Sequence, residues 1–236
     1  MGPRTGAPSV TGGRIPGPFL VLEGPEGAGK STQAELLTQW LESLGLPCLR
    51  VREPGGTALG EAIRTHLWVR PELPIPAVSE LFLLSAARHA LVEEVIRPQL
   101  AKGVLVLADR FYLSTLAYQG YGRGMDPEII TAVTRVATGG IEPDLTVVID
   151  VSVDTGRNRQ RLAGLDPDRI EREDSEFMQR VREGYRELAD ADPRIVMVNG
   201  DEAVDRLQER IRTLVRDRFP EWISQTRAEW PEGQAG

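Results

Sequence analysis

The amino-acid sequence has almost no cysteine and no long apolar run. Its one cysteine, Cys48, has no partner for a disulfide within the chain, and we interpret it as a small apolar residue of a strand. No apolar run approaches the roughly 20 residues that a helix needs to cross a bilayer, and no apolar signal-peptide core is present. We therefore predict a cytoplasmic protein with no membrane partner.

An excess of positive charge is missing as well. The chain carries a net charge of −7 and has a pI of about 5.1. A protein whose main ligand is nucleic acid usually presents a strongly basic surface, so we expect no nucleic-acid partner. A small phosphorylated ligand stays compatible with this charge balance, because a few local basic residues decide such binding.

The chain does contain enough apolar material for one large α/β domain. It has 236 residues, of which 41% are hydrophobic, and it needs no second domain to bury them. Residues 1–18 are rich in Gly and Pro without periodicity, so we predict a disordered leader there. We place the domain at residues 19–219 and a C-terminal tail at residues 220–236.

The segment from Gly24 to Ser31 matches the phosphate-binding P-loop pattern. It reads Gly-Pro-Glu-Gly-Ala-Gly-Lys-Ser. The apolar run from Phe19 to Leu22 before it is typical of a strand buried on both faces. Leu37 and Leu41 after it share one face of a predicted helix. The alternative, a glycine-rich turn beside a surface lysine, leaves this strand and helix unexplained.

The residue types of this loop suit a nucleoside triphosphate. Its glycines let the backbone N–H groups turn inward, and the following helix adds the positive end of its dipole. Lys30 would reach the β- and γ-phosphates, and the Ser31 hydroxyl would ligate Mg²⁺. The predicted nucleotide-binding residues are Gly24, Pro25, Glu26, Gly27, Ala28, Gly29, Lys30, Ser31 and Thr32.

Short apolar strands alternate with helices along the chain, which predicts a parallel sheet with helices on both faces. The expected fold class is α/β, of the P-loop NTPase type, with three α/β/α layers, a central parallel five-stranded sheet and a mobile lid. The expected strands are residues 19–22, 47–51, 104–108, 145–150 and 195–198. The expected helices are residues 32–43, 59–67, 78–99, 113–118, 127–138, 175–189 and 203–218, with a glycine-broken stretch at 120–124.

Residues just after the strands are the next candidates, because ligands lie beyond the carboxyl ends of parallel strands. Asp109 ends the third expected strand, where a carboxylate could hold Mg²⁺ directly or through water. Arg110 offers a planar fork of donors suited to a second phosphate. An ion pair at a strand end explains Asp109 and Arg110 equally well, so both interpretations stay open on this motif alone.

Residues 157–172 are rich in arginine. Phosphoryl transfer depends on positioning and charge stabilisation, so a closing lid that delivers arginines would suit it. Ordinarily a charge run of this kind is the solvated face of a helix. The predominance of arginine over lysine favours the lid, because bidentate phosphate contacts favour arginine.

Five motifs together resemble bacterial thymidylate kinase, a P-loop nucleoside monophosphate kinase family, over residues 19–218. The P-loop alone would indicate only a nucleoside triphosphate. Arg-Glu-Pro-Gly-Gly-Thr, Asp-Arg-Phe and Ala-Tyr-Gln-Gly are far more specific to this family. The motifs lie in the family's order and spacing at residues 23–32, 52–57, 109–111, 114–120 and 168–171.

The resemblance implies transfer of the γ-phosphoryl group of ATP, with Mg²⁺, to the 5′-phosphate of dTMP, which yields dTDP on the way to dTTP. It implies that Ser31 and Asp109 ligate the metal. Lys30 and Arg110 would neutralise charge on the transferring group. It also implies a homodimer, formed through the apolar faces of long helices such as residues 77–99.

The resemblance also implies how dTMP is held. Glu26 would contact the sugar 3′-hydroxyl, and Arg110 would grip the acceptor phosphate. Arg88 matches the arginine that donates to a thymine carbonyl, where cytosine presents an amino group. Tyr118 matches the aromatic residue near the sugar C2′, where its bulk disfavours a ribose hydroxyl. The full set assigned to dTMP is Glu26, Glu53, Arg64, Leu84, Arg88, Arg110, Ser114, Thr115, Tyr118 and Gln119.

One position departs from the family. Its members often carry a phenylalanine, stacked on thymine, four residues before the base-binding arginine. This chain has Leu84 there, and Phe82 lies on another face of the helix. We expect apolar contact without stacking, and hence weaker affinity for the base.

The P-loop also predicts the type of lid. Family members whose variable P-loop positions lack a basic residue supply catalytic cations from the lid, and residues 25–28 contain none here. The resemblance therefore implies a catalytic lid arginine, with Arg161 first and Arg159 next. The lid arginines are Arg157, Arg159, Arg161 and Arg169.

Two other functions stay open on the sequence. The nearer alternative is a kinase for another pyrimidine monophosphate, dUMP or UMP. The other is a P-loop protein that binds nucleotide as a switch and transfers nothing. The two classes differ in whether ADP forms only when a monophosphate is added.

Overall fold

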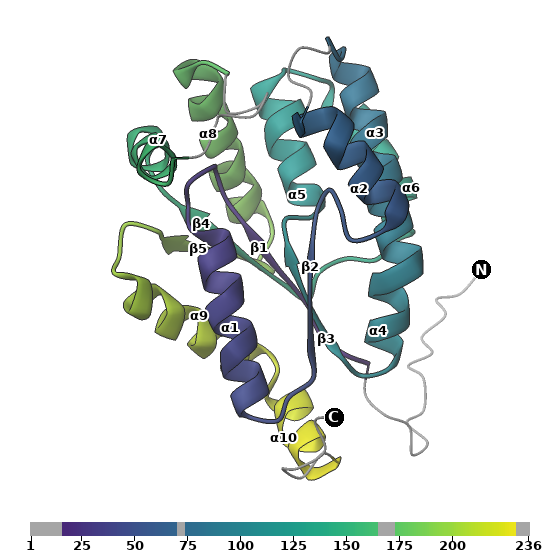
Figure 1. The fold of residues 1–236 in the computed structure, drawn as a ribbon, viewed down its shortest axis with the longest axis vertical. Coiled ribbons are helices and arrows are strands. Elements are labelled where there is room, and N and C mark those ends of the chain that lie inside the picture. Colours follow the sequence, from purple (N-terminus) through teal and green to yellow (C-terminus); the bar gives the residue numbers. More distant parts are fainter. Residues whose placement is uncertain (1–15, 70–73, 165–172, 230–236) are drawn as a thin grey trace, which may run out of the picture.

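A computed structural model describes residues 16–69, 74–164 and 173–229 of the chain (Figure 1). These ranges contain the P-loop and all five expected strands. Most of the expected leader, the end of the expected tail and the second half of the expected lid, including Arg169, lie outside the described residues.

The predicted central sheet is confirmed. Five strands pair in parallel in the order β2-β3-β1-β4-β5. In the pairing of β1 with β3, Leu22 lies opposite Asp109, so the carboxyl ends of these strands meet at one edge of the sheet. The strands are β1 (Phe19–Glu23), β2 (Cys48–Arg52), β3 (Leu105–Asp109), β4 (Leu145–Asp150) and β5 (Ile195–Asn199).

Helices follow the strands along the chain, as the alternating pattern predicts. Three of the segments, marked η, are π-helical. The helical segments are α1 (Lys30–Ser43), α2 (Ala58–Arg64), η1 (Thr65–Val69), α3 (Ala77–Leu91), η2 (Val92–Ile96), α4 (Arg97–Ala101), α5 (Tyr112–Thr115), η3 (Leu116–Gly122), α6 (Pro127–Ala137), α7 (Val153–Leu162), α8 (Ser175–Ala191), α9 (Val204–Arg218) and α10 (Pro220–Glu229).

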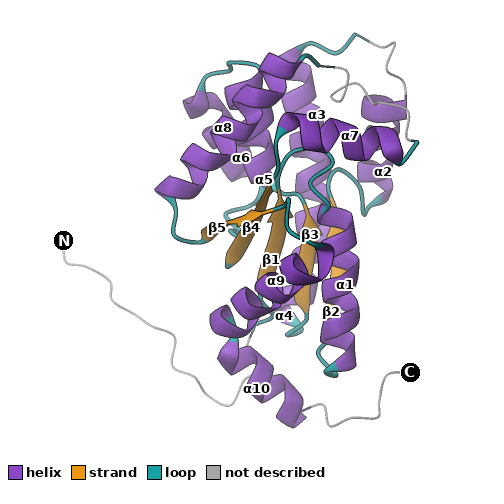
Figure 2. Cartoon of the chain, turned by 90° about the vertical axis from the view of Figure 1, so that its left-hand side faces the viewer, coloured by secondary structure: helices purple, strands orange, loops and turns teal. Residues whose placement is uncertain are grey.

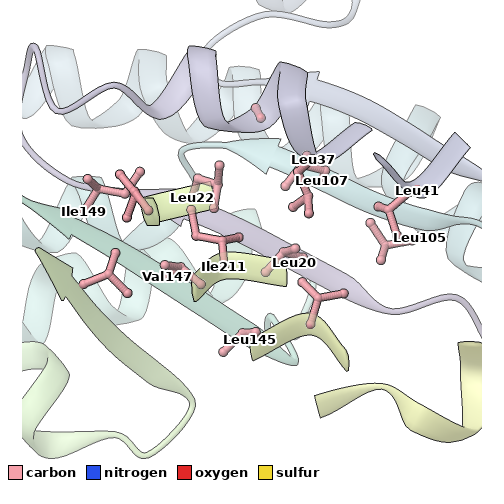
Figure 3. Close-up of a cluster of buried hydrophobic side chains, with 14 of the residues drawn as sticks. Leu20, Leu22, Leu37, Leu41, Leu105, Leu107, Leu145, Val147, Ile149 and Ile211 are labelled. Carbon is pink, nitrogen blue, oxygen red and sulfur yellow. The ribbon is translucent and has the colours of Figure 1, made fainter. Parts of the chain in front are cut away.

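Two helical layers enclose the sheet (Figure 2). On one face, α1 and α9 pack against side chains such as Leu20 and Leu107, and Figure 3 shows Leu37, Leu41 and Ile211 closing over them. On the other face, η2 covers β1 and β3, while η3 and α8 cover β4. All five residues of β1 are buried, because successive side chains point to opposite, equally covered faces.

The sequence pattern predicts that the glycines within residues 120–124 break the helix, but the helix continues past Gly120. Segment η3 continues to Gly122, where an added Cβ would lie 2.7 Å from the Phe177 ring. An added Cβ on Gly184 of α8 would likewise lie 2.5 Å from Tyr121. These glycines therefore allow η3 and α8 to pack closely, and this tertiary contact overrides the local tendency of glycine to end a helix.

The expected tail contains a docked helix, α10. Its Trp222 is buried, and the indole Nε1 donates to the Gly103 carbonyl at 3.0 Å. Gly103 precedes β3 at its amino end, so α10 closes the core at the end opposite the P-loop. None of the described helices combines the length and the apolar character needed to cross a membrane.

Candidate functional site

The P-loop joins the buried end of β1 to the start of α1. Gly24, Gly27 and Gly29 have φ values of 135°, 71° and 92°, a region that side chains with a Cβ rarely adopt. The ammonium of Lys30 donates to the carbonyls of Gly24 at 3.0 Å and Pro25 at 2.9 Å. The lysine is thus drawn back over the loop, at the start of a helix whose dipole favours anions.

The charge of Lys30 is destabilised where it lies. Burial lowers its pKa, and repulsion from Arg110 lowers it further, while Glu26 and Asp109 act in the opposite direction. An incoming polyphosphate would restore a close negative partner. The site therefore favours anionic ligands at this lysine.

Ser31 and Asp109 come together at the sheet edge that β1 and β3 share. The Ser31 hydroxyl donates to Asp109 Oδ2 at 2.7 Å. A hydroxyl oxygen beside a carboxylate suits Mg²⁺, which prefers oxygen ligands and keeps several waters or phosphate oxygens. Within the described residues no group of three or more His, Cys, Asp or Glu residues could hold a metal alone. The donor set thus fits a cation that phosphates also bind.

Arg110 adopts a left-handed backbone conformation, with φ of 73°, the only residue other than glycine with positive φ in the described ranges. Such a conformation costs of order 1 kcal/mol or more and persists where surrounding contacts hold it. Its guanidinium forms an ion pair with Glu26 and donates to Ser114 and Tyr185, each at 3.1 Å, and to Tyr118 at 3.2 Å. The side chain is fixed in place before any ligand binds.

Glu26 carries a negative charge inside this cluster. Burial would raise its pKa, but the charges of Arg110 and Lys30 and a hydrogen bond from Tyr118 outweigh that effect and lower it. An ionised carboxylate is a hydrogen-bond acceptor only. Glu26 can therefore accept from a hydroxyl or pair with a cation.

Two residues that support the site have no role assigned from the sequence. Glu23 is fully buried and accepts from the amides of Phe111 at 2.8 Å and Ser114 at 3.1 Å, and from the Tyr185 hydroxyl at 2.9 Å. The sequence does contain a signal for Glu23, because it is the one charged residue in the otherwise apolar strand β1. Tyr185 gave no local signal, since its partner Glu23 lies 162 residues away in the chain.

Arg88 is almost completely buried among polar partners. It donates from Nε to Glu53 at 2.7 Å, from one terminal nitrogen to Thr115 at 2.9 Å and from the other to the Phe111 carbonyl at 3.2 Å. Burial raises the pKa of Glu53 to about 7, although Arg88 acts to lower it. The guanidinium plane is thereby held rigidly at the wall of the cavity.

Leu84 occupies the position at which the family often has the phenylalanine that stacks on thymine. Leu84 lines the cavity, whereas Phe82 is 56% exposed and points to solvent. Arg64 also lines the cavity, and its guanidinium donates to the Pro54 carbonyl at 3.2 Å.

Helix α7 contains the first residues of the expected lid, and it packs against the P-loop. Its Gly156 approaches so closely that an added Cβ would lie 2.4 Å from the Glu26 carbonyl oxygen. Arg159 lines the cavity and donates to the Gly200 carbonyl at 2.9 Å. Arg161 is exposed, bonds to Asn158 at 3.0 Å, and is not among the cavity-lining residues.

One cavity of about 970 Å³ brings most of the predicted residues together. Gly24, Pro25, Ala28 and Arg161 do not line it. The predicted residues that do line it are Glu26, Gly27, Gly29, Lys30, Ser31, Thr32, Glu53, Arg64, Leu84, Arg88, Asp109, Arg110, Ser114, Thr115, Tyr118, Gln119 and Arg159.

Comparison with known proteins gives a consistent family. A sequence profile described as "Thymidylate kinase" matches residues 22–211. The thymidylate kinase of Nostoc punctiforme is 45% identical over 202 residues, which are 85% of this chain and 96% of that protein. The enzyme of Trichormus variabilis is 41% identical over 209 residues, or 88% of this chain and 99% of that protein. The crystal structure of thymidylate kinase from Ehrlichia chaffeensis matches with a TM-score of 0.69 and 28% identity, covering 85% of this chain and all of that one.

Proposed function

The chain belongs to the thymidylate kinase family, and on this premise we propose which of its residues carry out the reaction. The chain phosphorylates dTMP to dTDP, and the family uses ATP. The observation that carries our assignment is that one cavity is lined both by the P-loop and by Arg88, Arg110 and Tyr118. Two nucleotides can thus meet within it, phosphate to phosphate.

We assign the ATP phosphates to the P-loop. Its backbone amides and the start of α1 would bind them, and Lys30 would leave its carbonyl partners to contact the β- and γ-phosphates. Ser31 and Asp109 would hold Mg²⁺, which supplies charge neutralisation on the phosphate oxygens.

We assign the phosphate of dTMP to Arg110, with Arg64 as a further contact. The acceptor phosphate is already an anionic nucleophile, so the reaction demands no strong general base. Its barrier falls when fixed positive charge faces the oxygens of the transferring group, because that charge needs no reorganisation. Arg110 fits this role because its side chain is held by Glu26 and Tyr118 and its backbone by the strained turn.

The nucleoside of dTMP would lie against the remaining wall of the cavity. Glu26 would accept from the 3′-hydroxyl, and Tyr118 would fill the space that a 2′-hydroxyl needs. Arg88 would donate to a thymine carbonyl, with Ser114, Thr115 and Gln119 as neighbouring polar groups and Leu84 as the apolar contact. Glu53 would act through Arg88, to which it is hydrogen-bonded.

A lid arginine would complete the charge around the transferring group. Arg159 is the better placed in this structure, because it lines the cavity and its guanidinium lies 3.5 Å from the Gly27 carbonyl of the P-loop. The preference for Arg161 stays a prediction, and this residue can act only if α7 turns toward the cavity.

We also propose a cytoplasmic homodimer. Val78 and Phe82 of α3 and Ile129 and Val136 of α6 are apolar and between 52% and 75% exposed. The two helices lie side by side (Figure 1), so the four residues, here called the α3/α6 face, can be covered by a second copy of the chain. A single free cysteine suits a reducing compartment such as the cytoplasm.

The test is a coupled ADP-release assay with MgATP and four acceptors: dTMP, dUMP, UMP and dCMP. We expect the highest kcat/KM for dTMP, with dUMP about tenfold lower because it lacks one methyl group. UMP should fall further because of Tyr118, and dCMP because of Arg88. ADP release without a monophosphate is the control and should be negligible.

The second candidate substrate is dUMP, because Leu84 stands where the family often stacks an aromatic ring. A kcat/KM for dUMP or UMP equal to or above that for dTMP would contradict our assignment of the base pocket. Steady ADP release without any acceptor would contradict the whole assignment.

A further inference from the structure

The side-chain amide of Gln119 is held at one end and unpaired at the other. Gln119 lines the cavity and is 2% exposed. Its Nε2 donates to Glu80 at 2.6 Å, whereas its Oε1 is buried and has no hydrogen-bond partner among the described residues. Thr115, about one helical turn earlier, accepts from Arg88 at 2.9 Å. The oxygen that lacks a partner thus belongs to a side chain that lines the same cavity as Arg88.

The ion pair between Glu80 and Arg123 sets the orientation of the Gln119 amide. Glu80 of α3 is 1% exposed, and Arg123 donates to both of its carboxylate oxygens, from Nε at 2.9 Å and from a terminal nitrogen at 3.1 Å. The ion pair with Arg123 favours the ionised form of Glu80. An ionised carboxylate can only accept, so Gln119 must present its NH₂ group to Glu80 and its oxygen elsewhere.

A fixed carbonyl oxygen distinguishes between pyrimidine bases. Thymine and uracil carry a hydrogen on N3 that can be donated to such an oxygen. Cytosine has an unprotonated N3, whose lone pair would face the oxygen and be repelled. If the amide could turn over, its NH₂ group could instead donate to N3 of cytosine, and the distinction would be lost.

We propose that Glu80 and Arg123 are positioning residues that set the base selectivity of this enzyme, by locking Gln119 with its carbonyl oxygen toward the base. The proposal rests on the proposed function, in which Gln119 lies beside the base of dTMP. Neither Glu80 nor Arg123 lines the cavity, so both act through Gln119.

Arg123 has a second arm that provides a matched control. Its other terminal nitrogen donates to Glu173 at 2.9 Å, just before α8. Glu173→Gln weakens this contact and leaves both bonds to Glu80 in place. It therefore perturbs the same arginine without releasing the amide of Gln119.

The experiment measures the ratio of kcat/KM for dTMP to that for dCMP, with MgATP, in the full chain. In Glu80→Gln, residue 80 can donate as well as accept, so the Gln119 amide can turn over. We expect the ratio to fall tenfold or more, through a gain with dCMP as well as a loss with dTMP. In Glu173→Gln we expect the ratio to stay within twofold of wild type.

A double variant guards against misfolding. Glu80→Gln with Arg123→Gln replaces the Glu80–Arg123 ion pair by two neutral amides, so that neither member of this pair is left as a charge without the other. The double variant should show the same fall in the dTMP-to-dCMP ratio of kcat/KM as Glu80→Gln. A cooperative thermal unfolding transition of the double variant confirms that it is folded.

Two results would overturn the proposal: an unchanged ratio in both Glu80 variants, or an equal fall in kcat/KM for both acceptors. Failure of the proposed function is a separate outcome, because then the wild-type chain would not prefer dTMP in the first place.

Discussion

At the residue scale, burial and a neighbouring charge act in opposite directions on the pKa of the Glu53 carboxyl. One of its oxygens accepts from Arg88 at 2.7 Å, and the other is buried without a hydrogen-bond partner among the described residues. Burial raises the pKa of Glu53 from its ordinary value of 4.5 to about 7, and Arg88 only partly offsets this. Glu53 therefore binds its proton more tightly in the folded chain than in the unfolded one.

This pKa shift predicts a pH dependence of stability. Because the folded pKa is the higher one, Glu53 contributes stability below about pH 4.5 that is lost as the pH rises to about 7. In Glu53→Gln this contribution disappears, since glutamine does not titrate. We expect the unfolding free energy of wild type relative to the variant to fall by roughly 2 to 3 kcal/mol between pH 5 and pH 8.

Urea denaturation of both proteins at several pH values measures this difference, and titrations shared by the two proteins cancel in it. If the unfolding free energy of wild type minus that of Glu53→Gln stays constant or rises between pH 5 and pH 8, the Glu53 carboxyl is ionised in the folded chain throughout this range.

At the scale of elements, helix α7 meets the P-loop backbone to backbone. Gly156 and Gly27 lie so close that a Cβ on either one would come within 2.4 Å of a carbonyl oxygen of the other segment. A glycine inside a helix costs roughly 1 kcal/mol relative to alanine. That cost is offset here by an approach that no other residue allows, and the approach brings Arg159 to the cavity.

The two lid arginines can be tested as a pair. An arginine that contacts the transferring phosphoryl group stabilises mainly the transition state, so its loss lowers kcat and leaves KM for dTMP nearly unchanged. From the present position of α7, we expect Arg159→Ala to lower kcat by about 100-fold and Arg161→Ala to have a smaller effect.

Steady-state kinetics of both variants make this comparison. Arg206→Ala, at an exposed position of α9, controls for loss of positive charge alone and should leave kcat unchanged. A larger fall in kcat for Arg161→Ala would support the prediction made from the sequence and would mean that α7 turns during the reaction.

At the scale of the whole molecule, the exposed apolar residues are unevenly distributed. Four of them form the α3/α6 face, and Val136 is 75% exposed. Helix α3 carries Phe82 on its outer side and Leu84 on the cavity side. A dimer formed through the α3/α6 face would therefore buttress the helix that also supplies Arg88 and Glu80.

This arrangement predicts which substitutions break the dimer. Phe82→Asp and Val136→Asp place a charge in the α3/α6 face, and burying an unpaired charge in an interface is strongly unfavourable. We expect each variant to sediment as a monomer at concentrations where wild type is a dimer.

Val204→Asp is the matched control, because Val204 is 50% exposed but lies on α9 at the other face of the sheet. It should leave the dimer intact. A wild-type chain that sediments as a monomer, or a dimer lost in the control alone, would contradict the proposed interface.

Much of the architecture could be predicted from the sequence, because its signals are local. The apolar run before Gly24 predicts a buried strand, and the alternation of strands and helices predicts the parallel sheet that the structure contains. The predictions that failed lie where tertiary contact overrides local preference. The glycines near Gly122 predict a broken helix, yet η3 continues to that residue because α8 packs against it.

The sequence by itself determined the motifs whose parts are neighbours in the chain. A P-loop needs only spaced glycines, one lysine and one hydroxyl within a short segment, so its pattern is complete in the residues from Gly24 to Ser31. The tertiary structure alone decided which distant side chains meet. Tyr185 reaches Glu23 across 162 residues, and Arg123 reaches Glu80 across 43. Such contacts depend on strand register and helix packing, which place a side chain on one face or another and leave no mark in local sequence.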